Sequence, residues 1–233
     1  MALGLAERPQ ARWADLSVRV ISAAVLAPVG IFCVWMGGTV FTLVVIVAVV
    51  GLVAEWLTLC RRRPRFVWLA SAGLAYVALG GGSMWWLRDD PVAGRADVLF
   101  LLFIVWAGDV GAYLTGRWIG GPRMAPRISP GKTWSGACGG LVAAIAVGVI
   151  AAHLLTQGAP VWRGVVVAAC LGIVAQAGDL LESFVKRRLE VKDSSQLIPG
   201  HGGLFDRLDS VLAAAPVAAL LAITLGRGVV LWQ

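Results

Sequence analysis

The sequence predicts an all-α, polytopic integral membrane protein with about seven transmembrane helices and a cytoplasmic N-terminus. The chain of 233 residues is 59% hydrophobic and has a mean hydropathy of +0.82. Only 14% of its residues are charged, against roughly 25% in soluble domains. Lys and Arg are concentrated in alternate connectors between the apolar runs. Together these features are typical of a protein that crosses the membrane several times.

The apolar runs are long enough to cross a hydrocarbon core of roughly 30 Å. Residues 20–54 carry no charge and are too long for one span, so we expect two helices with a turn at Gly37-Gly38. The other five runs are residues 66–87, 98–116, 133–162, 164–181 and 210–226. We divide the chain into an N-terminal part with spans one to three, residues 1–97, and a catalytic membrane half, residues 98–233, with loops 117–133 and 183–207.

The basic residues predict the orientation. Sixteen of the twenty Lys and Arg residues precede the first span or follow the second, fourth and sixth spans. The remaining connectors hold Arg88, Arg95, Arg163 and Arg227. Since cytoplasmic connectors are enriched in Lys and Arg, we expect the N-terminus and both polar loops in the cytoplasm. This distribution accounts for the net charge of +7 without nucleic acid as a partner.

Acidic residues near the ends of spans are candidates for function, because a carboxylate in hydrocarbon costs at least a few kcal/mol. One face of the sixth span carries four polar residues at its end, Asp179, Glu182, Ser183 and Lys186. Asp206 and Asp209 stand three residues apart at the start of the seventh. Carboxylates beside cations are typical of a magnesium and polyphosphate site. A structural ion pair is the alternative for Asp179 and Glu182. Glu55 lies one turn from the membrane edge, near Arg61 to Arg63, and is interpreted as structural.

Glycines surround an imidazole in loop 183–207, where Gly202 and Gly203 follow His201. Because glycine lets backbone N–H groups approach an anion, this segment is a candidate phosphate cradle. Ordinary turn chemistry explains the glycines equally well.

Loop 117–133 ends in Ser129, Lys132 and Thr133, directly before an expected helix. The N-terminus of a helix favours anions, so these residues are candidates for phosphate binding. A P-loop is excluded, because Pro126 stands where that motif needs glycine and a membrane helix precedes the loop.

Several segments resemble phosphatidate cytidylyltransferases, the CDP-diacylglycerol synthases. The family's C-terminal signature is similar to Ser183-Phe-Val-Lys186-Arg187, Lys192-Asp193, His201-Gly202-Gly203 and Asp206-Arg207-Leu208-Asp209. Its other blocks are similar to residues 108–120, 129–134 and 178–183, so the likeness covers roughly residues 105–210. The resemblance implies transfer of CMP from CTP to phosphatidate with Mg²⁺, which gives CDP-diacylglycerol and pyrophosphate in phospholipid biosynthesis.

The resemblance and the charges together assign roles. We expect Asp179 and Asp206 to be the principal metal ligands, with Asp209 and Asp109 as further or outer ligands. The expected catalytic residues are Asp179, Lys186, Asp206 and Arg207. The expected substrate-binding residues are Ser129, Lys132, Thr133, Ser183, Arg187, Lys192, Asp193, His201, Gly202 and Gly203. No general base is needed, because the phosphate of phosphatidate is already ionised.

Two other functions are compatible with the residues alone. A CTP-dependent lipid kinase would release CDP in place of pyrophosphate. An ion-coupled transporter would place its acids near the middle of the bilayer, whereas most acids here stand at span ends. We expect a bacterial inner-membrane protein with a cytoplasmic active site, and the sequence leaves open whether it forms a homodimer.

Overall fold

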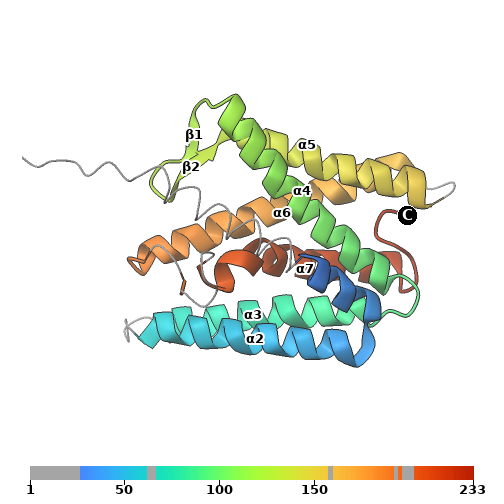
Figure 1. Cartoon of the computed structure of the whole chain (residues 1–233), viewed down its shortest axis with the longest axis horizontal. Helices are drawn as coiled ribbons and strands as arrows, with labels where there is room; N and C mark the ends of the chain where they lie inside the picture. The colour runs from blue at the N-terminus through green and yellow to red at the C-terminus, as the bar shows by residue number, and fades with distance from the viewer. Residues whose placement is uncertain (1–26, 62–66, 157–159, 192–193, 196–201) are drawn as a thin grey trace, which may run out of the picture.

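The computed structural model describes residues 27–61, 67–156, 160–191, 194–195 and 202–233, which form a bundle of long helices (Figure 1). Six helical segments are long and apolar enough to cross a membrane. They are α2 (Gly38–Arg61), α3 (Val67–Arg88), α4 (Gly94–Trp118), α5 (Trp134–Ile150) with the π-helical turn Ala151–Leu155, α6 (Val161–Arg188) and α7 (Phe205–Leu225). The chain is therefore an all-α polytopic membrane protein, as the sequence predicts.

A shorter apolar helix, Ala27–Met36, precedes α2. Gly37 and Gly38 separate the two helices with φ angles of +63° and +50°, in the left-handed region that favours glycine. The expected turn is thus confirmed. Residues 1–26, which include the start of the expected first span, lie outside the described residues, so seven spans and the cytoplasmic N-terminus stay predictions.

The polar connectors are shorter than expected because helices and strands extend into them. Helix α6 continues to Arg188, so the polar face that begins at Asp179 is helical throughout. Residues 117–133, which were expected to be a loop, contain an antiparallel hairpin of β1 (Arg123–Ala125) and β2 (Ser129–Thr133). The N–H of Trp134 donates to Pro122 O at 3.1 Å, which closes the hairpin against the start of α5.

Small residues allow the helices to approach one another closely. On α4, a Cβ added to Gly111 would stand 2.8 Å from the carbonyl oxygen of Gly139 on α5. The centre of the bundle contains fully buried alanines: Ala144, Ala168, Ala214, Ala215 and Ala218. Large apolar side chains instead point outward, as Val47 on α2 does with 70% exposure. This arrangement suits a protein whose surroundings are lipid.

A second apolar cluster joins α2 and α3 to α7. The rings of Trp56 and Phe205 stack with centroids 5.4 Å apart, and Val77 of α3 is fully buried beside them.

Figure 1 shows the hairpin and the ends of α2 and α6 at one end of the bundle, and the start of α4 and the C-terminus at the other. We call these the hairpin end and the C-terminal end. No comparison tests the division at residue 97, which stays a prediction.

Candidate active site

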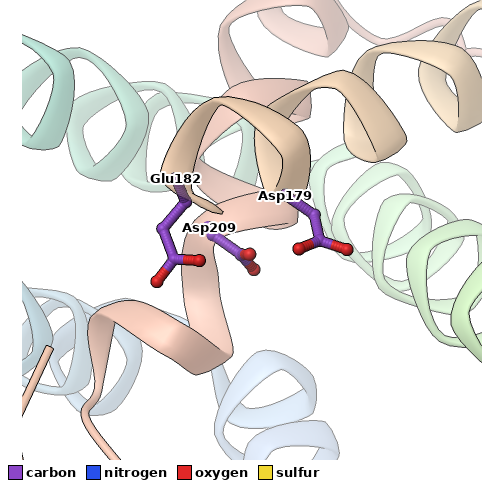
Figure 2. Close-up of side chains that lie close together, drawn as sticks. All are labelled: Asp179, Glu182 and Asp209. Carbon is purple, nitrogen blue, oxygen red and sulfur yellow. The ribbon is translucent and has the colours of Figure 1, made fainter. Parts of the chain in front are cut away.

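Three carboxylates meet at the hairpin end, Asp179 and Glu182 from α6 and Asp209 from α7 (Figure 2). Each contributes an oxygen that lies within 4.8 Å of the other two. The two helices touch here, since a Cβ on Gly178 would stand 3.0 Å from the carbonyl oxygen of Asp209. Glu182 and Asp209 are buried, whereas the Asp179 side chain is 35% exposed and faces a cavity. We call this group the carboxylate cluster.

The carboxylate cluster fits a magnesium ion. Magnesium binds oxygen ligands at about 2.0–2.1 Å, so ligands on opposite sides of the ion stand about 4 Å apart. Neighbouring ligands stand about 3 Å apart. The oxygens of the cluster lie within 4.8 Å of one another, so they would move closer together to bind one ion. Asp209 accepts a hydrogen bond from the N–H of Ser210 at 2.7 Å, which leaves its second oxygen for an ion. Asp179, Glu182 and Asp209 are therefore the residues that would hold the metal.

Two lysines flank the carboxylate cluster. Lys132, from strand β2, forms an ion pair with Asp179. Its buried Nζ forms no hydrogen bond of ordinary geometry within the described chain. On the other side, Lys186 Nζ lies 2.9 Å from Glu182 Oε1 and 2.8 Å from Asp206 Oδ1. The site thus offers both carboxylates for a cation and ammonium groups for phosphate.

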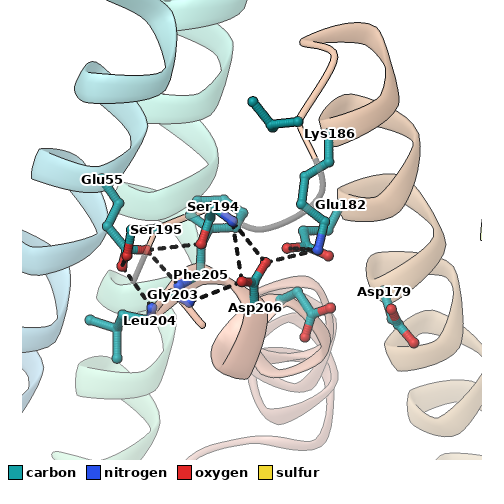
Figure 3. Close-up of polar contacts among 12 residues, drawn as sticks. Glu55, Asp179, Glu182, Lys186, Ser194, Ser195, Gly203, Leu204, Phe205 and Asp206 are labelled. Carbon is teal, nitrogen blue, oxygen red and sulfur yellow. Dashed lines mark hydrogen bonds and ion pairs between the residues drawn. The ribbon is translucent and has the colours of Figure 1, made fainter. Parts of the chain in front are cut away.

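Asp206 does not join the carboxylate cluster (Figure 3). Its carboxylate accepts hydrogen bonds from Lys186, from Ser194 N at 3.2 Å and from Gly203 N at 3.0 Å. The sequence paired it with Asp179 because both stand where a span meets the loop. Helices α6 and α7 run antiparallel, however, and the contact of Gly178 with Asp209 sets their register. Asp206 then lies one turn nearer the loop, where Lys186 binds it, and Glu182 supplies the third carboxylate.

Glu55 is a buried carboxylate on α2, with 5% exposure. It accepts hydrogen bonds from Leu204 N and Phe205 N, both at 2.8 Å, and from the hydroxyl groups of Ser194 and Ser195 (Figure 3). Leu204, the N-cap residue of α7, has no side chain that could cap the helix. Glu55 therefore caps α7 from another helix. Its role is structural, as expected. Its partners are backbone N–H groups and serine hydroxyls and not the nearby arginines, and Arg61 is exposed.

The hairpin residues occupy the expected side of the site. Thr133 is the N-cap of α5 and accepts a hydrogen bond from Gly136 N at 3.1 Å. Ser129 begins β2 opposite Ala125. Asp109 of α4 lines one cavity together with Lys132 and Asp179.

The remaining predicted residues surround this core. Arg187 is exposed and donates to Ile128 O at 3.2 Å, which ties α6 to the hairpin. Ser183 is half-buried on α6, and Arg207 is exposed in the first turn of α7. Gly202 has a φ angle of +82°, and the N–H of Gly203 is bound to Asp206. Three predicted residues lie outside the described chain: Lys192, Asp193 and His201.

Two cavities flank the end of α6. One, of about 440 Å³, is the more polar of the two, and we call it the polar cavity; its lining residues include Asp109, Arg117, Lys132, Gln176 and Asp179. The other, of about 230 Å³, is mainly apolar: its walls include Trp56, Leu69, Tyr76, Val185 and Phe205, with Glu182 and Lys186 also lining it. Members of the carboxylate cluster thus line both cavities.

Sequence reasoning did not assign roles to Glu182 or Tyr76. Glu182 stands on the same helix face as Asp179, and that spacing was the available signal. Tyr76 of α3 donates its hydroxyl to Asp209 O at 3.0 Å, across 133 residues of chain, which no local pattern indicates.

The chain is similar to known cytidylyltransferases. The model of a family described as the cytidylyltransferase family matches residues 64–225. A phosphatidate cytidylyltransferase of Brucella suis is 37% identical over 252 residues, which covers 88% of this chain and 93% of the relative. One of Rickettsia bellii is 30% identical over 87% of this chain and 89% of the relative. One of Haemophilus influenzae is 43% identical over 54% of this chain and 46% of the relative.

Proposed function

The chain belongs to the cytidylyltransferase family, and we propose that it transfers the CMP group of CTP to phosphatidate. The products are CDP-diacylglycerol and pyrophosphate, so the protein is a nucleotidyltransferase of phospholipid biosynthesis. The observation that supports this most strongly is the carboxylate cluster flanked by Lys132 and Lys186, with a polar and an apolar cavity on either side.

The reaction needs two polyanions side by side. An oxygen of the phosphatidate phosphate attacks the α-phosphorus of CTP, and the bond from that phosphorus to the β-phosphate oxygen breaks. The lipid phosphate is ionised at neutral pH, so no side chain has to remove a proton. The work of the site is therefore to hold the phosphates in line and to balance their charge.

The two cavities suggest where each substrate binds. The polar cavity of about 440 Å³ is within the size range of ligand pockets and contains Lys132, so we place CTP there. The apolar cavity suits the glycerol and the first part of an acyl chain of phosphatidate, with Lys186 beside its phosphate. In this arrangement the two phosphate groups meet at the carboxylate cluster.

We propose that Asp179, Glu182 and Asp209 hold magnesium. When bound, the ion would neutralise phosphate charge as pyrophosphate leaves. Lys132 and Lys186, now paired with carboxylates, would turn toward phosphate oxygens when the substrates enter. Asp206 acts as a positioning residue, because it holds Lys186 and the N–H groups of the loop.

The charge distribution supports a cytoplasmic active site in a bacterial inner membrane. Among the described residues, nine Lys or Arg side chains belong to connectors or helix ends at the hairpin end, and four belong to the C-terminal end. By the positive-inside tendency, the hairpin end faces the cytoplasm, where CTP is available. A homodimer stays a prediction.

The test is an assay of the purified protein in detergent with phosphatidate, magnesium and CTP labelled at the α-phosphate. We expect the label in the lipid and release of pyrophosphate. Release of labelled CDP would instead identify a lipid kinase. Ion flux in proteoliposomes without either product would favour a transporter.

A further inference from the structure

A cavity of about 1010 Å³ lies toward the C-terminal end of the bundle, away from the carboxylate cluster. Its walls come from helix Ala27–Met36, from α4, from α5 with its π-helical turn, and from the C-terminal segment. The volume is at the upper end of the range of about 300–1,000 Å³ that is typical of ligand pockets. The transfer reaction does not account for it.

The cavity follows one face of α4. Arg95, Leu99, Phe103, Trp106 and Val110 line it at intervals of three or four residues. From Arg95 to Val110 the helix rises about 22 Å, which is most of the roughly 30 Å of a hydrocarbon core. The cavity is therefore an apolar slot with a length suited to an acyl chain.

Two arginines, Arg88 at the end of α3 and Arg95 in the first turn of α4, line the slot where these helices end and begin. Arg88 donates from Nε to Val34 O at 2.6 Å, and the Arg95 guanidinium lies 4.5 Å from the ring centre of Trp35. Both guanidinium groups thus contact the end of the short helix before α2, at Val34 and Trp35.

The described carboxylates at the C-terminal end pair with groups other than Arg88 and Arg95. Asp89 and Asp90 pair with Arg227 at 3.6 Å and 3.4 Å, and Asp97 accepts the N–H of Leu231 at 2.8 Å. Throughout the described part of the chain, neither arginine of the slot forms an ion pair. Two like charges at the mouth of an apolar slot call for an anion that the described chain does not supply.

We propose that this slot binds one anionic phospholipid, with its phosphate between Arg88 and Arg95 and one acyl chain along α4. Guanidinium groups bind phosphate oxygens through paired hydrogen bonds, and the apolar walls bury the chain. The π-helical turn supports the assignment, because Ala151 and Leu155 of this turn line the slot and π-helical turns are frequent at functional sites. The site is distinct from the substrate cavities and does not depend on the proposed reaction.

Thermal unfolding of the purified protein in a neutral detergent tests this site. We expect dioleoylphosphatidylglycerol at ten times its dissociation constant to raise Tm by about 3–6 °C. Dioleoylphosphatidylcholine and soluble glycerol phosphate should raise it much less. Arg95→Gln should abolish most of the shift, and so should Ala107→Phe, which keeps both arginines but fills the slot.

Two controls separate this site from others. Arg163→Gln removes another arginine at the same end, which stacks 5.6 Å from the Trp162 ring and does not line the slot, so the shift should persist. Asp179→Asn should also keep the shift, because that residue belongs to the carboxylate cluster. CMP transfer in detergent by Arg95→Gln should stay near the wild-type rate.

Three results would overturn the proposal. One is an equal shift with phosphatidylcholine, and another is an undiminished shift in both Arg95→Gln and Ala107→Phe. The third is loss of the shift in Asp179→Asn, which would assign the lipid to the substrate site. If light scattering found a dimer that Arg95→Gln dissociates, the slot would instead be occupied by a second copy of the chain.

Discussion

The two ends of the bundle both hold charged side chains at helix ends, but they balance the charges differently. At the hairpin end, the carboxylates are paired with lysines: Lys132 binds Asp179, and Lys186 binds both Glu182 and Asp206. At the C-terminal end, Asp89 and Asp90 pair with Arg227 and Asp97 accepts a backbone N–H group, so among the described residues Arg88 and Arg95 have no carboxylate partner. A site with both signs can bind a cation and an anion together, whereas a site with one sign selects an anion.

The largest expected effect is on enzymatic activity, which should depend on the hairpin end and not on the C-terminal end. Asp179→Asn and Asp209→Asn each remove a charge that would hold the metal, so CDP-diacylglycerol formation should fall about a hundredfold or more. Tm measurements should show that both variants fold. Arg95→Gln serves as the matched control and should keep its activity. Equal activity of all three variants and wild type over a magnesium titration would contradict the distinction.

A second experiment divides the hairpin end itself. Glu182→Gln should raise the magnesium concentration for half-maximal activity by about 10–100-fold, because it removes the negative charge of a metal ligand. Asp206→Asn should lower activity and Tm without changing the magnesium requirement, since Asp206 holds Lys186 and the loop. If both variants raised the magnesium requirement equally, Asp206 would be a ligand as the sequence predicted.

A third experiment concerns the support of the site. Glu55→Gln weakens the acceptor for the first N–H groups of α7, which should cost about 1–3 kcal/mol and lower Tm by about 2–10 °C. Asp89→Asn is the comparison at the other end, because its side chain is 58% exposed and its change in Tm should be small. A Tm for Glu55→Gln that equals that of Asp89→Asn would show that Glu55 is not the cap of α7.

The smallest effect is a pH dependence at the C-terminal end. Burial favours a higher pKa for Asp90, but hydrogen bonds from three backbone N–H groups and from Arg227 outweigh it and hold the pKa below its usual range. Because the folded-state pKa is depressed, Asp90 stabilises the fold above about pH 4, and this contribution is lost as the pH falls through the depressed value. Asp90→Asn should lower Tm at pH 7, and the difference from wild type should shrink on acidification. A Tm difference between Asp90→Asn and wild type that grew on acidification would contradict a depressed pKa of Asp90.

The sequence predicted the membrane spans well because a bilayer imposes length and hydropathy directly. The five spans expected after residue 65 correspond to α3 to α7, and the turn at Gly37-Gly38 is where α2 begins. The hairpin at Arg123–Thr133 was not predicted, because its strands of three and five residues have no alternating apolar pattern. Their pairing depends on the close approach of α4 and α5, which is a tertiary property.

The carboxylate cluster was predicted in part for a similar reason. Helical spacing placed Asp179 and Glu182 on one face, and the resemblance pointed to the start of α7. Spacing within each helix does not give the register between two antiparallel helices, so the sequence favoured Asp206 where the structure brings Asp209 and Glu182 to Asp179. The role of Glu55 as a cap was hidden because its partners are 139 to 150 residues away.

That separation has a consequence for how the protein is made. Helix α2 leaves the ribosome long before Leu204, which lies 149 residues later in the chain. At about 5–20 residues per second, the carboxylate of Glu55 waits about 7–30 s for its hydrogen-bond donors. Since an uncapped carboxylate is unfavourable in hydrocarbon, we expect Glu55 to stay hydrated at the membrane surface during this interval. We therefore expect α2 to reach its final depth only after α7 has been synthesised, so that the N-terminal spans and the active site are completed together.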